Sequence, residues 1–176
     1  MKKIFSIVAA LFVTITAFGQ SNILRQRLEV AEVEVNDGEV NLEVFQMQDN
    51  GQYYLSVGTM GIGDDIIQIH FDPLTELFIP LGGTLEEAIN KLDQIRDYYK
   101  QGAGKSWEVE GCLSIGNPTD NLETIKITGR QLLFSKLLEF SVQRDDLVRA
   151  THIARSDFNS LVSGVKFYQK LHPNEK

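Results

Sequence analysis

The stretch TLEEAINKLDQI (residues 84–95) predicts the clearest helix in the chain. Thr84 and Glu87 have the spacing of a capping box, in which the hydroxyl and the carboxylate each satisfy a backbone N–H at the helix start. Apolar residues then recur at intervals of three and four, the spacing that places them on one face of a helix. This stripe comprises Leu85, Ala88, Ile89, Leu92 and Ile95. The helix must therefore bury one face against another element.

A second amphipathic helix is predicted near the C-terminus. Ser156 is its expected N-cap, and Pro173 stands beyond its expected end. Its stripe comprises Phe158, Leu161, Val162, Val165 and Tyr168, which superimposes on the first stripe at an offset of 73 residues. A duplicated unit of strands followed by a helix would explain this match. The alternative is chance, because any two amphipathic helices can be slid into such a register.

The residues before the first helix predict antiparallel strands. Apolar and charged residues alternate from Leu28, and the parity slips at Ala31 in a way that fits a β-bulge. Turn signals follow at 36–39 and 49–51, where Asp, Asn and Gly tolerate the positive φ of tight hairpins. The glycine-rich segment 58–65 is expected to be a flexible connection rather than a strand.

Further strands are expected between the two helices. One is predicted from Trp107 to Ile115 with an interruption at Gly111, and another around Ile125. Residues 130–143 carry both helical and alternating patterns, and we favour a strand for their second half. Together these elements predict an α+β fold, a mostly antiparallel sheet with two amphipathic helices packed on one face.

The N-terminus predicts a cleavable secretory signal. A lysine pair precedes an uncharged run over residues 4–18, which is shorter than the roughly 20 apolar residues that span a bilayer. Ala17 and Gly19 provide the small side chains that a signal peptidase accepts before its cut. We therefore predict a signal peptide over residues 1–19 and a single globular α+β domain over residues 20–176. An uncleaved membrane anchor is the alternative.

Cleavage would leave a soluble, acidic protein in the periplasm or outside the cell. Residues 1–19 carry two lysines and no acid, so their removal moves the formal net charge from −7 to −9. Such a surface repels phosphate backbones and anionic lipid headgroups, and the sequence shows no Lys/Arg cluster, so nucleic acid is not an expected partner. No later segment has the length of a transmembrane helix, so no stable membrane insertion is expected after cleavage.

Candidate catalytic chemistry is confined to a few residues. Cys112 is the only thiol and the obvious nucleophile, with His70 or His152 as a base. In the competing interpretation, Cys112 packs beside Leu113 and Ile115 as a small hydrophobe. His70 and Asp72 would share a strand face as a weak metal pair, but the histidines have no ligand-like spacing. We therefore assign no catalytic, cofactor-binding or metal-binding residue and expect no cofactor.

Two functional hypotheses remain open from the sequence. The first is an exported, non-catalytic binding or interaction module for a protein, peptide or glycan partner. The aromatic pairs at 53–54 and 98–99, with Trp107, could stack on such a ligand, although one ring of each pair is expected in the core. The second is an exported hydrolase whose site assembles from scattered carboxylates, or from Cys112 and a histidine.

Overall fold

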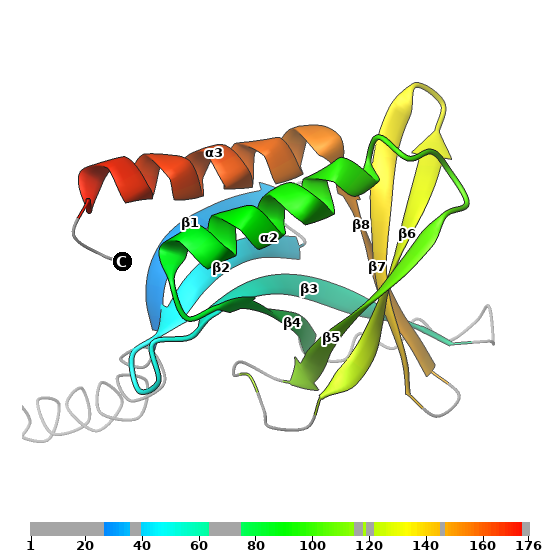
Figure 1. The fold of residues 1–176 in the computed structure, drawn as a ribbon. Coiled ribbons are helices and arrows are strands. Elements are labelled where there is room, and N and C mark those ends of the chain that lie inside the picture. Colours follow the sequence, from blue (N-terminus) through cyan, green and yellow to red (C-terminus); the bar gives the residue numbers. More distant parts are fainter. Residues whose placement is uncertain are drawn as a thin grey trace, which may run out of the picture.

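The computed structural model describes residues 27–35, 40–63, 75–114, 118, 122–144 and 147–173. Over these residues it contains eight strands and two helices (Figure 1). In chain order they are β1 (Arg27–Val35), β2 (Val40–Met47), β3 (Tyr53–Gly63), β4 (Thr75–Gly82), α2 (Leu85–Tyr98), β5 (Ser106–Ser114), β6 (Glu123–Leu132), β7 (Ser135–Arg144), β8 (Leu147–Ala154) and α3 (Arg155–Leu171). An eight-stranded antiparallel sheet with both helices packed against it confirms the predicted α+β class. The predicted signal peptide and the turn at 36–39 lie outside the described residues.

The strands pair in sequence order, and two of them change partner along their length. β3 pairs with β4 over Tyr53–Thr59 and with β8 over Met60–Gly63. β5 pairs with β6 over Ser106–Gly111 and with β4 over Cys112–Ser114. The sheet therefore changes direction, and Figure 1 shows β6, β7 and β8 standing steeply across β1, β2 and β3. This bend lets the β6–β7 hairpin project beyond the layer that the helices cover.

Both glycine positions expected to interrupt strands lie within them instead. The expectation that segment 58–63 is a connection is wrong, because β8 supplies a new ladder where β4 ends and β3 continues. At Gly111, a Cβ atom would lie against Ile125 Cδ1 and only 2.5 Å from the Phe78 carbonyl oxygen. Glycine is therefore needed there for the close approach of neighbouring strands, and it does not end the strand. The predicted β-bulge is confirmed by a register shift between Glu29 and Ala31.

The first helix begins as the sequence predicts, and the second does not. In α2, the Glu87 N–H donates to Thr84 Oγ1 at 3.2 Å, and the Thr84 N–H donates to Glu87 Oε2 at 3.2 Å. All five residues of its predicted stripe are buried. The N-cap of α3 is Ala154, which makes no side-chain cap hydrogen bond. Ser156 lies within the first turn and donates to Asp157 Oδ1, so its prediction as the N-cap was wrong.

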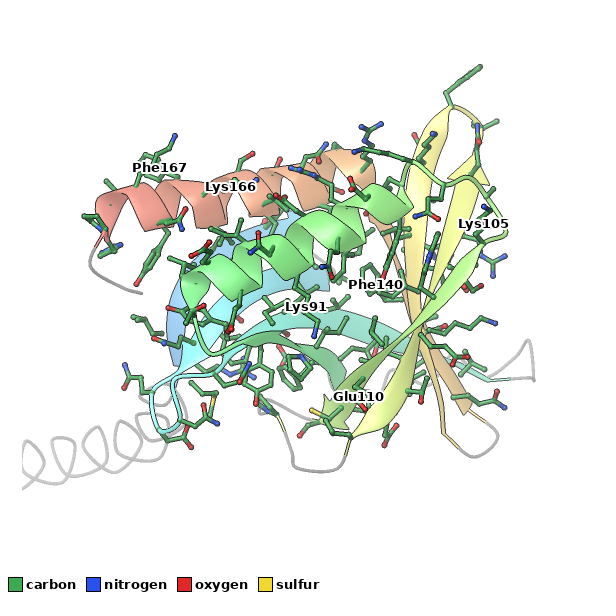
Figure 2. The ribbon with its side chains drawn as sticks, in the orientation of Figure 1. Lys91, Lys105, Glu110, Phe140, Lys166 and Phe167 are labelled. Atoms are coloured by element: carbon green, nitrogen blue, oxygen red, sulfur yellow. The ribbon has the colours of Figure 1, made fainter. Side chains whose placement is uncertain are left out.

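The two helices lie side by side over one face of the sheet (Figure 1). Lys166, labelled in Figure 2, joins them through an ion pair to Asp93 with Nζ–Oδ2 at 2.9 Å. The Tyr99 hydroxyl donates to the Ile153 carbonyl at 3.0 Å and ties the end of α2 to β8. The core beneath draws on both helices and on strands from both halves of the chain. Neither described helix is long and apolar enough to cross a membrane.

The order of elements repeats, with four strands and a helix followed by four strands and a helix. The 73-residue offset between the helical stripes also relates Asp93 to Lys166, which face each other across the helix pair. Within the described residues the strand pairings of the two halves differ. In the first half the third strand, β3, changes partner from β4 to β8, whereas in the second half the first strand, β5, changes from β6 to β4. The repeat is therefore one of element order and helix packing.

Truncation of a side chain in the apolar stripe of α2 should show how much the helix–sheet contact contributes to the free energy of unfolding. Leu92 has no exposed surface, so Leu92→Ala should lower the free energy of unfolding by about 2–5 kcal/mol. Gln94→Ala is the matched control, because Gln94 is exposed on the same helix. Chemical denaturation measures both variants. A loss for Leu92→Ala no larger than that for Gln94→Ala would mean that α2 does not bury this face.

Candidate functional site

The tip of the β6–β7 hairpin exposes three consecutive apolar side chains. Leu132, Leu133 and Phe134 are 64%, 83% and 99% exposed. Leu132 pairs with Ser135, so Leu133 and Phe134 form a two-residue turn. Leu133 has φ of 52°, a left-handed conformation that tight turns usually give to Gly, Asn or Asp. The tip therefore carries large apolar residues where the fold alone favours small or polar ones.

The loop between α2 and β5 is anchored to the base of this hairpin. The Gly104 N–H donates to the Gly129 carbonyl at 2.8 Å, and the Gly129 N–H donates to the Lys105 carbonyl at 2.8 Å. A Cβ atom at position 129 would lie 2.6 Å from the Gly102 carbonyl oxygen, so this approach depends on glycine. Figure 2 labels Lys105 on this loop beside the hairpin. The loop and the hairpin thus form one surface.

The start of α3 completes that surface. An open concavity of about 320 Å³ is bordered by residues 134–136 and 154–156. We call the assembly the hairpin end. It comprises the hairpin residues 129–137, the loop residues 99–105 and the junction residues 154–156.

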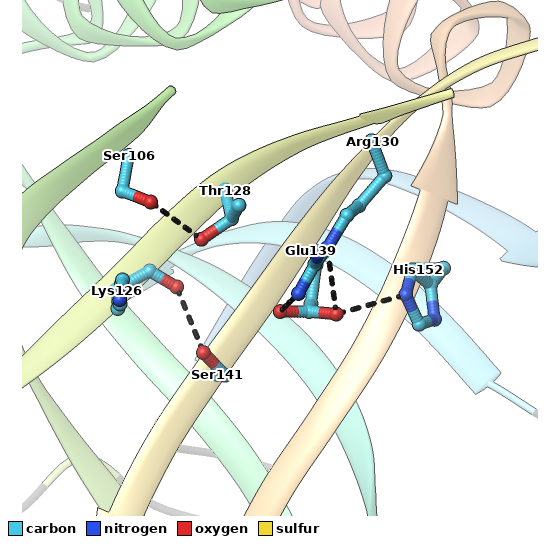
Figure 3. A network of polar contacts seen from close by, with 7 residues as sticks. All are labelled: Ser106, Lys126, Thr128, Arg130, Glu139, Ser141 and His152. Carbon is cyan, nitrogen blue, oxygen red and sulfur yellow. Dashed lines mark hydrogen bonds and ion pairs between the residues drawn. The ribbon is translucent and has the colours of Figure 1, made fainter. Parts of the chain in front are cut away.

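A larger concavity opens beside the apolar tip. It has a volume of about 540 Å³ and is lined by Arg130, Gln131, Leu132, Leu137, His152 and Ala154. Glu139 orders two of these side chains (Figure 3). Arg130 donates to it through Nε at 3.1 Å and Nη2 at 2.9 Å, and His152 Nε2 lies 3.1 Å from Oε2. The concavity therefore presents a positioned guanidinium and an imidazole beside apolar side chains.

The pKa of Glu139 reflects this arrangement. Partial burial alone would raise the pKa, but the hydrogen bonds and charges of Arg130 and His152 outweigh it and leave the pKa below its ordinary value. The ionised carboxylate thus persists at neutral pH and holds both partners in place.

Cations gather at the hairpin end of this acidic protein. They are Lys100, Lys105, Arg130, Lys136 and Arg155, and all five are exposed. Lys100 is paired with Asp97, and Arg130 with Glu139. Within the described residues, Lys105, Lys136 and Arg155 take part in no ion pair. The hairpin end is therefore a local positive surface around an apolar tip.

A second polar cluster lies on the sheet face opposite the helices. Arg27 Nη1 lies 3.6 Å from Glu43 Oε2, and Arg27 Nη2 lies 3.3 Å from Glu76 Oε2. The guanidinium also lies 4.2 Å from the ring centre of Phe45, and Ser56 Oγ donates to Glu76 at 3.1 Å. We call these five residues the Arg27 cluster. The three charged side chains are each only 15–21% exposed.

Glu43 has an unusual pKa within the Arg27 cluster. Burial raises its pKa from 4.5 to about 7, Arg27 opposes the rise, and the nearby Glu76, Glu32 and Glu29 add to it. A carboxyl group with such a pKa suits general acid–base chemistry. However, Glu43 and Glu76 both face Arg27, and neither lines the concavities described above. The cluster therefore serves as charge compensation for a half-buried arginine.

The structure does not bring Cys112 and His152 together. Cys112 is buried with Phe45, Met47 and Phe78, in accordance with the packing interpretation, although its predicted neighbour Leu113 packs in the main core. His152 lies on β8 and is bonded to Glu139. His70 and Asp72 lie outside the described residues. Over the residues that are described, no three candidate metal ligands come close enough to hold an ion.

The aromatic pairs divide as expected between core and margin. Tyr53 and Tyr99 are buried. Tyr54 stacks on Phe45 with ring centres 5.7 Å apart, and Tyr98 stacks on Trp107 at 4.1 Å. These rings therefore contact each other within the protein. Among the described residues the largely exposed aromatic side chains are Phe134 and Phe167, and no sequence pattern singled out Phe134.

The two unusual carboxylates should respond to pH in opposite directions. Because the folded pKa of Glu43 is raised, its contribution to stability is fully present below pH 4.5 and is lost as pH rises toward 7. Glu43→Gln should therefore gain stability relative to the wild type over that interval. Because the folded pKa of Glu139 is lowered, its contribution is present above pH 4.5 and is lost as pH falls.

Glu139→Gln serves as the matched variant in this experiment. Its stability should fall further below that of the wild type as pH rises from acid to neutral. Thermal unfolding of the three proteins at a series of pH values measures both trends. Two parallel trends, or two flat ones, would contradict the assigned environments.

Comparisons of the chain with protein-family models, curated proteins and solved structures found no match. Inference about function therefore rests on the geometry of the described residues. The Arg27 cluster is largely closed to solvent, whereas the hairpin end is open and combines an apolar tip, a concavity and exposed cations. A molecule approaching from solution can reach the hairpin end, which makes it the candidate functional site.

Proposed function

We propose that this protein is an exported, non-catalytic binding module and that the hairpin end is its binding surface. The observation that carries the proposal is the run of Leu132, Leu133 and Phe134 at the tip. Single exposed apolar residues are ordinary on protein surfaces, but a contiguous apolar projection rimmed by polar groups is typical of an interaction site. Covering a Leu or Phe side chain with a partner contributes roughly 1.5–3 kcal/mol.

The hairpin end presents this tip in a defined conformation. β6 and β7 pair without a register shift from Lys126 to Leu132. Ser106 and Thr128 hydrogen-bond at 3.0 Å, and Ser141 donates to the Lys126 carbonyl at 3.3 Å (Figure 3). Such preorganisation supports binding, because less conformational entropy is lost when a partner docks.

The placement of the candidate catalytic groups favours this proposal over an exported hydrolase. The thiol of Cys112 lies among apolar side chains, whereas a reactive thiol needs partial exposure and a base or positive field. Glu43 and Glu76 are engaged with Arg27, and neither lines the 540 Å³ or the 320 Å³ concavity. His152 lines the 540 Å³ concavity and is bonded to Glu139, but the candidate nucleophile Cys112 lies elsewhere.

Site-specific photocrosslinking tests the binding surface whatever the partner is, because the crosslink itself captures it. We expect p-benzoylphenylalanine in place of Phe134, in the native host, to form discrete covalent adducts on irradiation. The same substitution at Phe167 is the control, because Phe167 is also an exposed aromatic but lies on α3. Adducts at position 134 and none at position 167 would support the proposal. No adduct at position 134, or identical adducts at both positions, would contradict it.

A further inference from the structure

We infer that the hairpin end docks on the surface of an anionic phospholipid bilayer, with Leu132, Leu133 and Phe134 entering the interface. This inference rests on the proposed function and names the partner of the same surface. Such attachment is peripheral and reversible, and it differs from stable insertion of a membrane-spanning segment.

The shape of the tip favours a fluid apolar phase. The apolar side chains project from a two-residue turn, the outermost point of the β6–β7 hairpin. A protein partner would need a preformed groove complementary to this convex tip. The boundary between headgroups and acyl chains receives such a projection without a matching cavity, and apolar side chains anchor peripheral proteins there.

The charges around the tip select an anionic surface. Lys105, Lys136 and Arg155 are exposed, belong to three different segments of the hairpin end, and have no ion-pair partner within the described ranges. Each cation close to an anionic bilayer strengthens binding by about fivefold. The rest of this acidic protein is repelled by the same surface, so the charge asymmetry orients the tip toward the lipid.

The same charges disfavour a second copy of the chain as the occupant. A symmetric dimer through the hairpin end would bring Lys105, Lys136 and Arg155 of one copy close to the same residues of the other. Like charges brought together across an interface oppose association. An anionic partner therefore fits the surface better than self-association does.

Vesicle cosedimentation tests the inference directly on the exported protein. The probes are vesicles of pure phosphatidylcholine and vesicles of an equimolar mixture of phosphatidylcholine and phosphatidylglycerol. We expect binding to the mixed vesicles, little binding to phosphatidylcholine alone, and weaker binding as salt is raised. No preference for the anionic vesicles would overturn the inference.

Variants assign the binding to the hairpin end. The double variant Leu133→Ser/Phe134→Ser should lower the partition coefficient by more than about tenfold, and Lys136→Gln by about fivefold. Phe167→Ser is the control for loss of an exposed aromatic and should bind like the wild type. Far-UV circular dichroism checks that the variants are folded. Undiminished binding by the folded double variant would show that another segment holds the membrane and would overturn the inference.

The crosslinking result separates this inference from the proposed function. Adducts at position 134 with a protein, together with no vesicle binding, would overturn the membrane inference and leave the binding module in place with an acidic protein as its partner. Adducts with phospholipid, together with vesicle binding, support both. The absence of adducts and of vesicle binding would contradict both.

Discussion

The fold depends on how closely β4, β5 and β6 approach one another at Gly111. At this residue β5 leaves β6 and joins β4, and the Phe78 carbonyl oxygen lies 2.5 Å from where a Cβ atom would stand. β3 makes the corresponding change, from β4 to β8, after Thr59. Through these two exchanges the strands that precede and follow α2 become one bent sheet. Each helix can then pack on a core to which both halves contribute.

The bend also separates two charged regions that have different physical roles. The Arg27 cluster lies against the β1–β4 face, where burial raises the pKa of Glu43 to about 7 and a guanidinium compensates the remaining charge. The hairpin end lies beyond the helices, where Glu139 stays ionised and holds Arg130 and His152 at the edge of an open concavity. Glu43 thus helps to balance the charge of Arg27 within the protein, whereas Glu139 positions Arg130 and His152 at its surface. The second arrangement is open to solvent and lies beside the apolar tip on which the proposed function rests.

The features predicted correctly from the sequence are local ones. The capping box at Thr84, the buried stripe of α2, four of the five stripe residues of α3 and the β-bulge at Ala31 each follow from side chains within a few residues. The fifth residue of the α3 stripe, Tyr168, is only partly buried. Ser156 shows where a local signal fails, because Ala154 is already the N-cap of α3 and the serine falls within the first turn. The strand through residues 58–63 was missed because its stability comes from β8, which lies far along the chain.

The candidate site was missed for related reasons. Leu133 occupies a turn position without the Gly or Asn that normally marks one, so residues 130–143 carried no turn signal. An apolar run with Arg130 and Gln131 on one side and Ser135 and Lys136 on the other was the signal available for a hairpin tip. The convergence of the loop 99–105 on Gly129 could not be inferred from spacing. Likewise, Arg27 and Glu76 are 49 residues apart and meet only because β1 to β4 lie in one sheet.

The close approach of the strands at Gly111 is tested most directly by comparing the free energy of unfolding of Gly111→Ala with that of Gly83→Ala. Gly111 is buried with a backbone oxygen within 2.5 Å of the added methyl group, whereas Gly83 is exposed with no atom within 4 Å of it. Gly111→Ala should lose about 1–3 kcal/mol of unfolding free energy, the usual range for overpacking, or fail to fold. Gly83→Ala should change it by less than about 1 kcal/mol. Equal stability of the two variants would contradict the claim that the close approach at Gly111 joins the halves of the sheet.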